Sequence, residues 1–430
     1  MAIEKTSLII KGGHLIDPGS GLNETKDILI EDGRISAIDK PGSIPANRAA
    51  KSIDAKGKWV VPGLIDVHVH LREPGFEYKE TISTGTQAAI AGGFTSVACM
   101  ANTQPVNDSR HVTAFIRERA KSHAACRVFP IGAVSRGLRG EELAEIGGMV
   151  EEGAVAISDD GMPVMNSYLM RKAMDYARAF SIPVISHAED LNLVGKGVMN
   201  EGIHSTRLGL RGIPAASEEI LVAREVALAR LTGCRVHIAH LSTQVGIEHV
   251  RRAKEEGLHI TAEVTPHHLT LNDSHLESYD TCLKMAPPLR SEVDVAAVTE
   301  ALATGVIDMI ATDHAPHGLI DKAVEFDHAV CGVLGLQTAV GVTLDLVKSG
   351  KISPLRWVES LTYLPAKLIN VPHGTLAIGA DADITLIDPE LKWKWSEEDN
   401  RSKSANSPFQ NREFTGKATH TVLGGQIVYG

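Results

Sequence analysis

The sequence predicts an α/β protein, namely a (β/α)₈ TIM-type barrel with a small composite β-sandwich domain made from the N- and C-terminal segments. Eight short apolar runs end in polar or small residues, and segments with helical periodicity separate most of them. Strands that alternate with helices form parallel sheets, and eight such strands close into a barrel. Both chain ends instead carry strand-like runs between glycine turns. We expect the barrel in residues 61–369 and the β domain in residues 1–60 and 370–430.

The first 60 residues are predicted to form short strands joined by tight turns. The apolar runs here are Ser7–Ile10, His14–Asp17, Asp27–Ile30 and Arg34–Ile38. Asp32-Gly33 separates the last two of these runs, and an Asp-Gly pair in that position is a strong hairpin signal. We see no catalytic motif in this unit.

The barrel is predicted from its eight apolar runs. They are Leu64–His70, Phe94–Met100, Val128–Gly132, Ala154–Ser158, Pro183–His187, Val236–His240, His259–Val264 and Met309–Asp313. Helical periodicity is clearest in Lys79–Ala91, Met170–Phe180, Ser217–Leu231 and Gly246–Glu256. An open doubly wound sheet is the alternative, but it would need a glycine-rich phosphate loop after its first strand. That position holds His-Val-His-Leu-Arg instead.

The C-terminal part is predicted to return to β structure after a helix at Pro354–Leu368. Strand-like runs follow at Gly374–Leu376, Ala382–Asp388 and Thr421–Tyr429, whereas Lys392–Asn411 is polar and reads as a surface excursion. Neither β end is large enough to make a stable sheet alone. We therefore expect the two ends to combine into one sheet beside the barrel.

The composition limits which binding partners and which cellular compartment are expected for the chain. The chain is 43% hydrophobic and has a net charge of −10 without a basic block, which argues against nucleic acid or an anionic membrane as the main partner. Its five cysteines are scattered without CxxC spacing, as free thiols in a reducing compartment would be. The N-terminus lacks the apolar segment of a signal peptide, and no apolar run has membrane-spanning length. We therefore expect a cytoplasmic protein.

His68 and His70 are the first candidate metal ligands. Side chains alternate along a strand, so these two imidazoles project to one side at the end of the first barrel strand. Two imidazoles placed in this way can hold one metal ion. Arg72 follows two residues later and could reach the same cleft.

Other barrel strands also end in residues of metal-ligand type. They are Asp159 or Asp160 after the fourth strand, His187 after the fifth, His240 after the sixth and Asp313 after the eighth. Active sites of such barrels lie at the C-terminal ends of the strands, so these side chains should meet. The set is too large for one four-coordinate zinc ion and suits two metals bridged by a carboxylate. Spacing does not separate Asp159 from Asp160, and it places His237 on the opposite face from His240.

Several motifs together resemble the class I dihydroorotases of the amidohydrolase superfamily. The matching segments are His68–Gly75, Met100–Pro105, Ser158–Gly161, Thr265–His268, Pro287–Arg290, Asp313–His317, Gly374–Asp388 and Ser407–Phe409. This resemblance covers nearly the whole chain. It implies two Zn²⁺ ions per subunit, with the ligands His68, His70, Asp160, His187, His240 and Asp313.

The resemblance also implies a role for each ligand. His68, His70 and Asp313 would hold one ion, and His187 and His240 the other. Asp160 would bridge the two ions, because the fourth strand ends without the lysine that many relatives carboxylate for this purpose.

Substrate contacts follow from the same resemblance. It implies that Arg72, Asn102 and His317 bind the substrate carboxylate and that Asp313 is the general base and then the general acid. One position departs from the family pattern, since Ala286 stands where asparagine is usual.

The implied reaction is the reversible hydrolysis of (S)-dihydroorotate to N-carbamoyl-L-aspartate in de novo pyrimidine (UMP) biosynthesis. A homodimer is expected, with a possible association with aspartate carbamoyltransferase. A hydantoinase or allantoinase is the alternative enzyme, although those relatives do not usually keep an arginine at the position of Arg72. A non-catalytic dihydroorotase-like subunit of a carbamoyltransferase complex is the other alternative, and the complete ligand set argues against it. Gly318–Gly332 is polar and is expected to be a mobile loop over the site.

Overall fold

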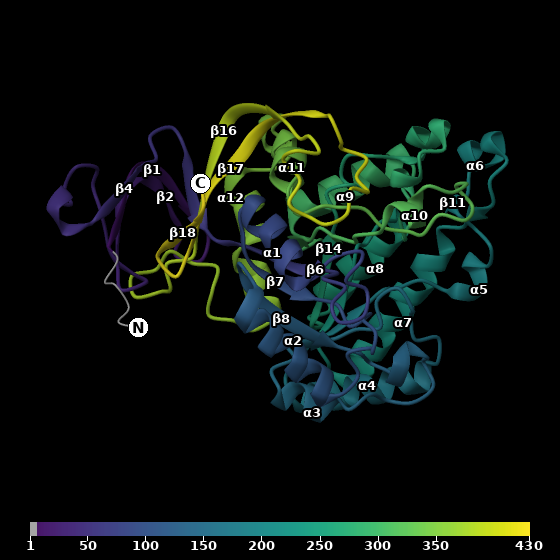
Figure 1. Cartoon of the computed structure of the whole chain (residues 1–430). Coiled ribbons are helices and arrows are strands. Elements are labelled where there is room, and N and C mark those ends of the chain that lie inside the picture. The colour runs from purple at the N-terminus through teal and green to yellow at the C-terminus, as the bar shows by residue number, and fades with distance from the viewer. Residues whose placement is uncertain (1–6) are drawn as a thin grey trace.

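The computed structural model describes residues 7–430 and confirms the predicted fold class (Figure 1). Eight parallel strands lie in the order β15-β14-β13-β10-β9-β8-β7-β6. A bridge between Val69 and His314 brings the first strand beside the end of the last, and the backbone N–H of His70 donates to the His314 carbonyl at 2.9 Å. The strands are β6 (Leu64–Val69), β7 (Phe94–Cys99), β8 (Arg127–Gly132), β9 (Ala156–Ile157), β10 (Val184–Ser186), β13 (Val236–Ile238), β14 (Ile260–Val264) and β15 (Met309–Ile310).

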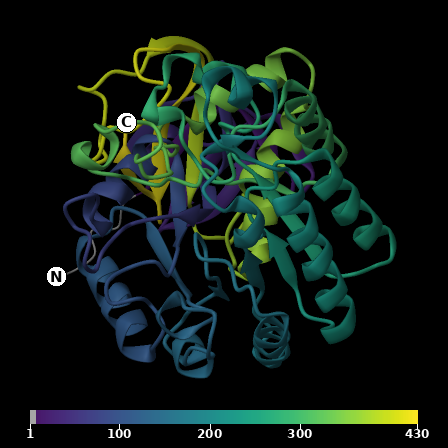
Figure 2. The ribbon, with the colours of Figure 1, turned by 90° about the vertical axis from the view of Figure 1, so that its right-hand side faces the viewer.

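Helices surround these strands, as Figure 2 shows from the barrel side. The larger ones are α1 (Ile82–Ala91), α2 (Arg110–His123), α3 (Ile146–Glu151), α4 (Ser167–Ala179), α7 (Ala216–Thr232), α8 (Gln244–Glu255), α9 (Glu292–Thr304) and α11 (Ala339–Lys348). Because helices cover the outside and side chains fill the inside, β6 and β7 are buried along their whole length. Within residues 7–430, no helix is both long and apolar enough to cross a membrane.

Capping residues set the helix starts that periodicity alone could not locate. The helix predicted from Lys79 begins at Ile82, because the Thr81 hydroxyl accepts a hydrogen bond from the backbone N–H of Thr84 at 3.1 Å. Asn166 and Thr243 cap α4 and α8 in the same way.

The predicted helix at Pro354–Leu368 is two helices, α12 (Pro354–Leu361) and α13 (Tyr363–Leu368). The chain leaves helical geometry at Thr362, which has φ −133° and ψ −77°. Pro365 explains this break, because proline has no N–H to donate and its ring clashes with the carbonyl four residues earlier.

The second sheet combines the two chain ends, with β17, β16, β5, β1 and β2 in adjacent positions. Leu386 of β16 pairs with Val60 of β5, which in turn pairs with β1. The strands are β1 (Leu8–Asp17), β2 (Leu22–Glu31), β3 (Arg34–Asp39), β4 (Lys51–Asp54), β5 (Trp59–Pro62), β16 (Ile384–Lys394), β17 (Glu413–Leu423) and β18 (Gln426–Tyr429). Figure 1 shows this sheet, purple and yellow, beside the barrel.

Two predictions about the C-terminal part are wrong. Gly374–Leu376 is not a strand; its backbone turns around Asp17, whose carboxylate accepts from the N–H of Leu376 at 2.8 Å. Lys392–Asn411 is not a surface excursion, because β16 continues to Lys394 and the side chains of Trp395 and Phe409 are buried. The polar character of this segment misleads because some of its polar side chains bind backbone groups of the barrel loops, as Ser404 does with the Lys79 carbonyl.

The remaining short elements lie in the loops of the barrel, except for one 3₁₀ turn between β3 and β4 of the second sheet. They are α5 (Leu191–Val194), β11 (Met199–Asn200), α6 (Ile203–Leu208), β12 (Gly212–Ile213), α10 (Leu319–Lys322), and the 3₁₀ turns η1 (Ala46–Arg48), η2 (Arg136–Leu138), η3 (Asp273–Ser278) and η4 (Thr281–Leu283).

Candidate active site

The predicted metal ligands meet at the C-terminal ends of the barrel strands. His68 lies in β6 and His70 directly follows it, and the others follow β9, β10, β13 and β15. All six are buried: His68, His70, Asp160, His187, His240 and Asp313. They border a cavity of about 310 Å³ whose lining includes His70, Arg72, Asn102, Asp160, Gly161, His187, Glu189, Ala286, Asp313, Ala315, His317, Cys331 and Gly332.

Asp160 lies among four imidazoles. Its Oδ1 is 3.4 Å from His68 Nε2, 3.4 Å from His187 Nδ1 and 3.5 Å from His240 Nε2, and its Oδ2 is 3.4 Å from His70 Nε2. Asp313 approaches two of them from the other side, with Oδ1 3.0 Å from His70 Nε2 and 3.5 Å from His68 Nε2. Two groups of potential ligands therefore share Asp160, one with His68 and His70 and one with His187 and His240.

These residues fit a metal site on two observations. Buried polar atoms normally find a hydrogen-bond partner, yet His68 Nε2, His187 Nδ1 and Asp160 Oδ1 have none. The separations of about 3.4 Å also match what a metal requires, since two ligands of a tetrahedral zinc ion with bonds of about 2.1 Å lie about 3.4 Å apart. The site therefore suits cations shared between imidazole nitrogens and carboxylate oxygens.

The far nitrogens of the histidines are held by acceptors. His68 Nδ1 donates to Glu263 Oε1 at 2.5 Å, and His70 Nδ1 donates to Asn102 Oδ1 at 2.8 Å. Such contacts fix the tautomer and turn the other nitrogen towards a metal. Burial raises the pKa of Glu263, but the neighbouring His68 and His237 outweigh this and lower that pKa to about 2.

Asp159 and Asp160, which spacing could not separate, have different surroundings. The Asp159 carboxylate accepts from the backbone N–H groups of Val134 at 2.7 Å and Ser135 at 3.1 Å. Burial raises the pKa of Asp159 to about 6 despite these hydrogen bonds. Asp159 therefore shapes the loop after β8, whereas Asp160 faces the histidines.

The predicted orientation of His237 is wrong. Its Nε2 lies 3.0 Å from Glu263 Oε2, so the ring points into the barrel below the histidine cluster. Alternation fails because β13 ends at Ile238 and His240 has a positive φ of 32°. Both imidazoles consequently face the interior, although His237 belongs to neither group of potential ligands.

Arg72 and His317 form one side of the cavity. The Arg72 side chain donates from Nε to the Pro316 carbonyl at 3.2 Å, and its Nη2 lies 3.3 Å from His317 Nε2. Burial lowers the pKa of Arg72 to about 10, while Asp313 and Asp160 oppose this shift, so the guanidinium stays charged at neutral pH. Burial, together with Arg72 and Lys79, lowers the pKa of His317 to about 2, which keeps its imidazole neutral.

Lys79 lies behind His317 and was not predicted as a site residue. Its Nζ is 3.2 Å from His317 Nδ1 and 3.2 Å from Asp321 Oδ2. We call Arg72, the neutral His317 and Lys79 behind it the cationic side of the cavity, after the charges of Arg72 and Lys79. An anionic group on a ligand would find its counter-charge there.

Asn102 and Ala286 also line the cavity. Asn102 is the acceptor for His70, so it joins the metal-ligand side to the cavity wall. Ala286 offers only a methyl group at the position where the resemblance expects asparagine.

The Gly318–Gly332 loop is anchored at one point and exposed at another. Lys322 Nζ donates to the carbonyls of Thr281 at 2.9 Å, Lys284 at 3.2 Å and Val330 at 2.8 Å. Leu319 and Ile320, by contrast, are 83% and 77% exposed. The mobility of this loop stays a prediction.

The barrel with histidines and aspartates at its strand ends is the architecture of the amidohydrolases. A family model described as "Amidohydrolase family" matches residues 206–429, and one described as "Dihydro-orotase-like" matches residues 57–245. In three dimensions the chain is similar to the L-hydantoinase (dihydropyrimidinase) of Arthrobacter aurescens, with a TM-score of 0.89 and 26% identity over 99% of this chain and 96% of that one.

Relatives in sequence are closer. A dihydroorotase of Anaeromyxobacter dehalogenans is 51% identical and one of Pelotomaculum thermopropionicum is 54% identical, each over 98% of both chains. The chain belongs to the dihydroorotase family.

Proposed function

We propose that this chain catalyses the reversible hydrolysis of (S)-dihydroorotate to N-carbamoyl-L-aspartate, as a step of pyrimidine biosynthesis. The observation that carries the proposal is the cavity itself, which has a buried arginine on one side and the cluster of histidines and aspartates on the other. Dihydroorotate presents a carboxylate to the first and a ring amide to the second.

The metals are proposed to be two Zn²⁺ ions. His68, His70 and Asp313 would hold one, His187 and His240 the other, and Asp160 would bridge them, in keeping with the distances around Asp160. When bound, such a pair supplies Lewis-acid activation of a carbonyl and of a water molecule.

Asp313 is proposed to move the proton. Its carboxylate lies beside the histidines and borders the cavity, so it can take a proton from the attacking water and deliver it to the ring nitrogen as the amide bond breaks. The environment holds the pKa of Asp313 below its usual value: burial would raise it, but His68 and His70 outweigh burial. A carboxylate that is ionised at neutral pH can serve as the base.

Arg72 and His317 are proposed to orient the substrate through its carboxylate. Arg72 has already committed Nε to Pro316 and approaches His317 with Nη2, which leaves Nη1 and the second N–H of Nη2 for the ligand. Asn102 is proposed as a further contact from the cavity wall. Holding the carboxylate fixes the distance between the ring amide and the activated water.

A hydantoinase activity is the second candidate, because the barrel resembles that of the Arthrobacter enzyme. Sequence identity to relatives named dihydroorotase is about twice as high, and a buried arginine has no counter-charge on an uncharged hydantoin ring. These two points favour dihydroorotate.

Further proposals concern assembly and location. A homodimer and a possible association with aspartate carbamoyltransferase are suggested by the family resemblance. A cytoplasmic location is suggested by five free cysteines, of which Cys99, Cys126 and Cys234 are buried.

The direct test is to incubate the purified chain with dihydroorotate, follow loss of the ring amide in the ultraviolet, and measure bound metals by elemental analysis. We expect turnover that a chelator removes and added Zn²⁺ restores. A metal-loaded, folded chain without turnover in either direction would refute the proposal.

A further inference from the structure

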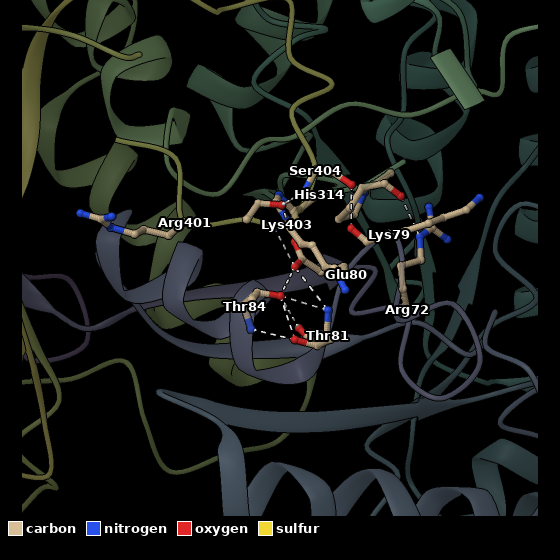
Figure 3. A network of polar contacts seen from close by, with 12 residues as sticks. Arg72, Lys79, Glu80, Thr81, Thr84, His314, Arg401, Lys403 and Ser404 are labelled. Carbon is tan, nitrogen blue, oxygen red and sulfur yellow. Dashed lines mark hydrogen bonds and ion pairs between the residues drawn. The ribbon is translucent and has the colours of Figure 1, made fainter. Parts of the chain in front are cut away.

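The segment 402–407, between β16 and β17, is tied to the mouth of the barrel. The backbone N–H of Lys403 donates to Glu80 Oε1 at 3.1 Å, and the Ser404 hydroxyl donates to the Lys79 carbonyl at 2.6 Å. Figure 3 shows Lys403 and Ser404 beside Lys79 and Glu80, with Arg72 nearby.

Asn406 makes the deepest contact of this segment. Its Oδ1 accepts from the backbone N–H of His317 at 3.0 Å, and its Nδ2 donates to the carbonyls of Ala315 and Gly332, both at 3.0 Å. The residue is only 4% exposed. One amide group therefore joins the loop after β15 to the loop that contains Gly332.

These two loops form the wall around His317. Ala315, His317 and Gly332 line the cavity, whereas Asn406 does not. Gly332 packs so closely that a Cβ added there would lie 2.9 Å from His317 Nε2. The position of the ring therefore depends on how the two loops are held together.

We propose that Asn406 is a positioning residue for the cationic side of the cavity: it sets where His317 meets the substrate carboxylate without touching the substrate. The inference rests on the proposed function. Asp313 has an anchor that does not involve Asn406, because the adjacent His314 is fixed to β6 by the bridge to Val69 and by the hydrogen bond from the His70 N–H. Loss of Asn406 should therefore weaken substrate binding and spare the chemical step.

The test compares Asn406→Ala and Asn406→Ser with Asn400→Ala. Asn400 is a matched control in the same β16–β17 connection. Its side chain donates to the Ser404 carbonyl at 2.7 Å and accepts from the Ser402 N–H at 3.0 Å, and neither hydrogen bond reaches the barrel loops. We expect KM for dihydroorotate to rise about tenfold in both Asn406 variants, as for one or two lost buried hydrogen bonds. We expect kcat to stay within about twofold, and Asn400→Ala to leave KM unchanged.

A second readout does not need the substrate. Hydrogen exchange at the His317 amide should be faster in the Asn406 variants than in wild type and Asn400→Ala, because that amide donates to Asn406. Unchanged exchange, an unchanged KM, or an equal rise of KM in Asn400→Ala would overturn the inference. A wild-type chain without dihydroorotate turnover would instead refute the proposed function. The exchange experiment would still test whether Asn406 holds the loop around His317.

Discussion

Replacing Arg72 by methionine tests the substrate assignment most sharply. Methionine keeps part of the side-chain volume and removes the guanidinium. Arg72 is buried, and its terminal nitrogens are free of backbone acceptors, so a bound carboxylate gains charge-assisted hydrogen bonds from it. Hydrogen bonds to charged groups contribute about 1.5–3 kcal/mol each. A loss of about 3 kcal/mol corresponds to a decrease of about 150-fold in kcat/KM.

The assay is steady-state hydrolysis of dihydroorotate, with N-carbamoyl-L-aspartate formation as a second readout. Arg72→Lys keeps the charge but loses the planar fork, so we expect an intermediate decrease of about tenfold. Arg252→Met is the control, since Arg252 is exposed on α8 and its ion pair within residues 7–430 is with Glu248 of the same helix. If Arg72→Met retained kcat/KM within about twofold of wild type, the assignment of Arg72 to the substrate carboxylate would be refuted.

Three further predictions concern the base, the buried lysine and the loop. Asp313→Asn should lower kcat by about 10²–10⁴ while metal content stays close to wild type, because the other ligands remain; near-normal kcat with full metal content would remove Asp313 from proton transfer. Burial lowers the pKa of Lys322 from 10.5 to about 8, so the unfolded chain binds more protons between these values and stability should rise with pH there. Urea unfolding should show this rise in wild type and a flatter profile in Lys322→Met, and identical profiles would contradict the stated cause. Hydrogen exchange in Gly318–Gly332 should slow when N-carbamoyl-L-aspartate binds. An exchange rate that is the same with and without this ligand would count against a loop that closes over the site.

Much of this site could be predicted because it lies at strand ends. Apolar runs identify buried parallel strands, and the residue that follows each run must open onto the same face of a barrel. That rule alone brings His68, His187 and Asp313 together although they are far apart in the sequence.

The rest of the site depends on backbone geometry and long-range contacts that the spacing of apolar residues does not reveal. His237 and His240 both face inward because the backbone of His240 leaves the strand conformation. Glu263 holds His68 from β14, which is separated from β6 by β15, and no local pattern marks it as a partner. Asn406 accepts a hydrogen bond from the backbone N–H of His317, 89 residues earlier in the chain. It lies in a polar segment whose sequence resembles that of a surface loop. The Asp-Gly turn that helped to predict the N-terminal hairpin says nothing about such long-range contacts.

The central claim is that the cationic side of the cavity selects a ring that carries a carboxylate. Its most direct test is to compare kcat/KM for dihydroorotate and for unsubstituted hydantoin on the same metal-loaded preparation. We predict efficient opening of dihydroorotate and a far lower value for hydantoin, because only the first ligand pairs with Arg72. A preparation that opens hydantoin as well as or better than dihydroorotate would contradict the account.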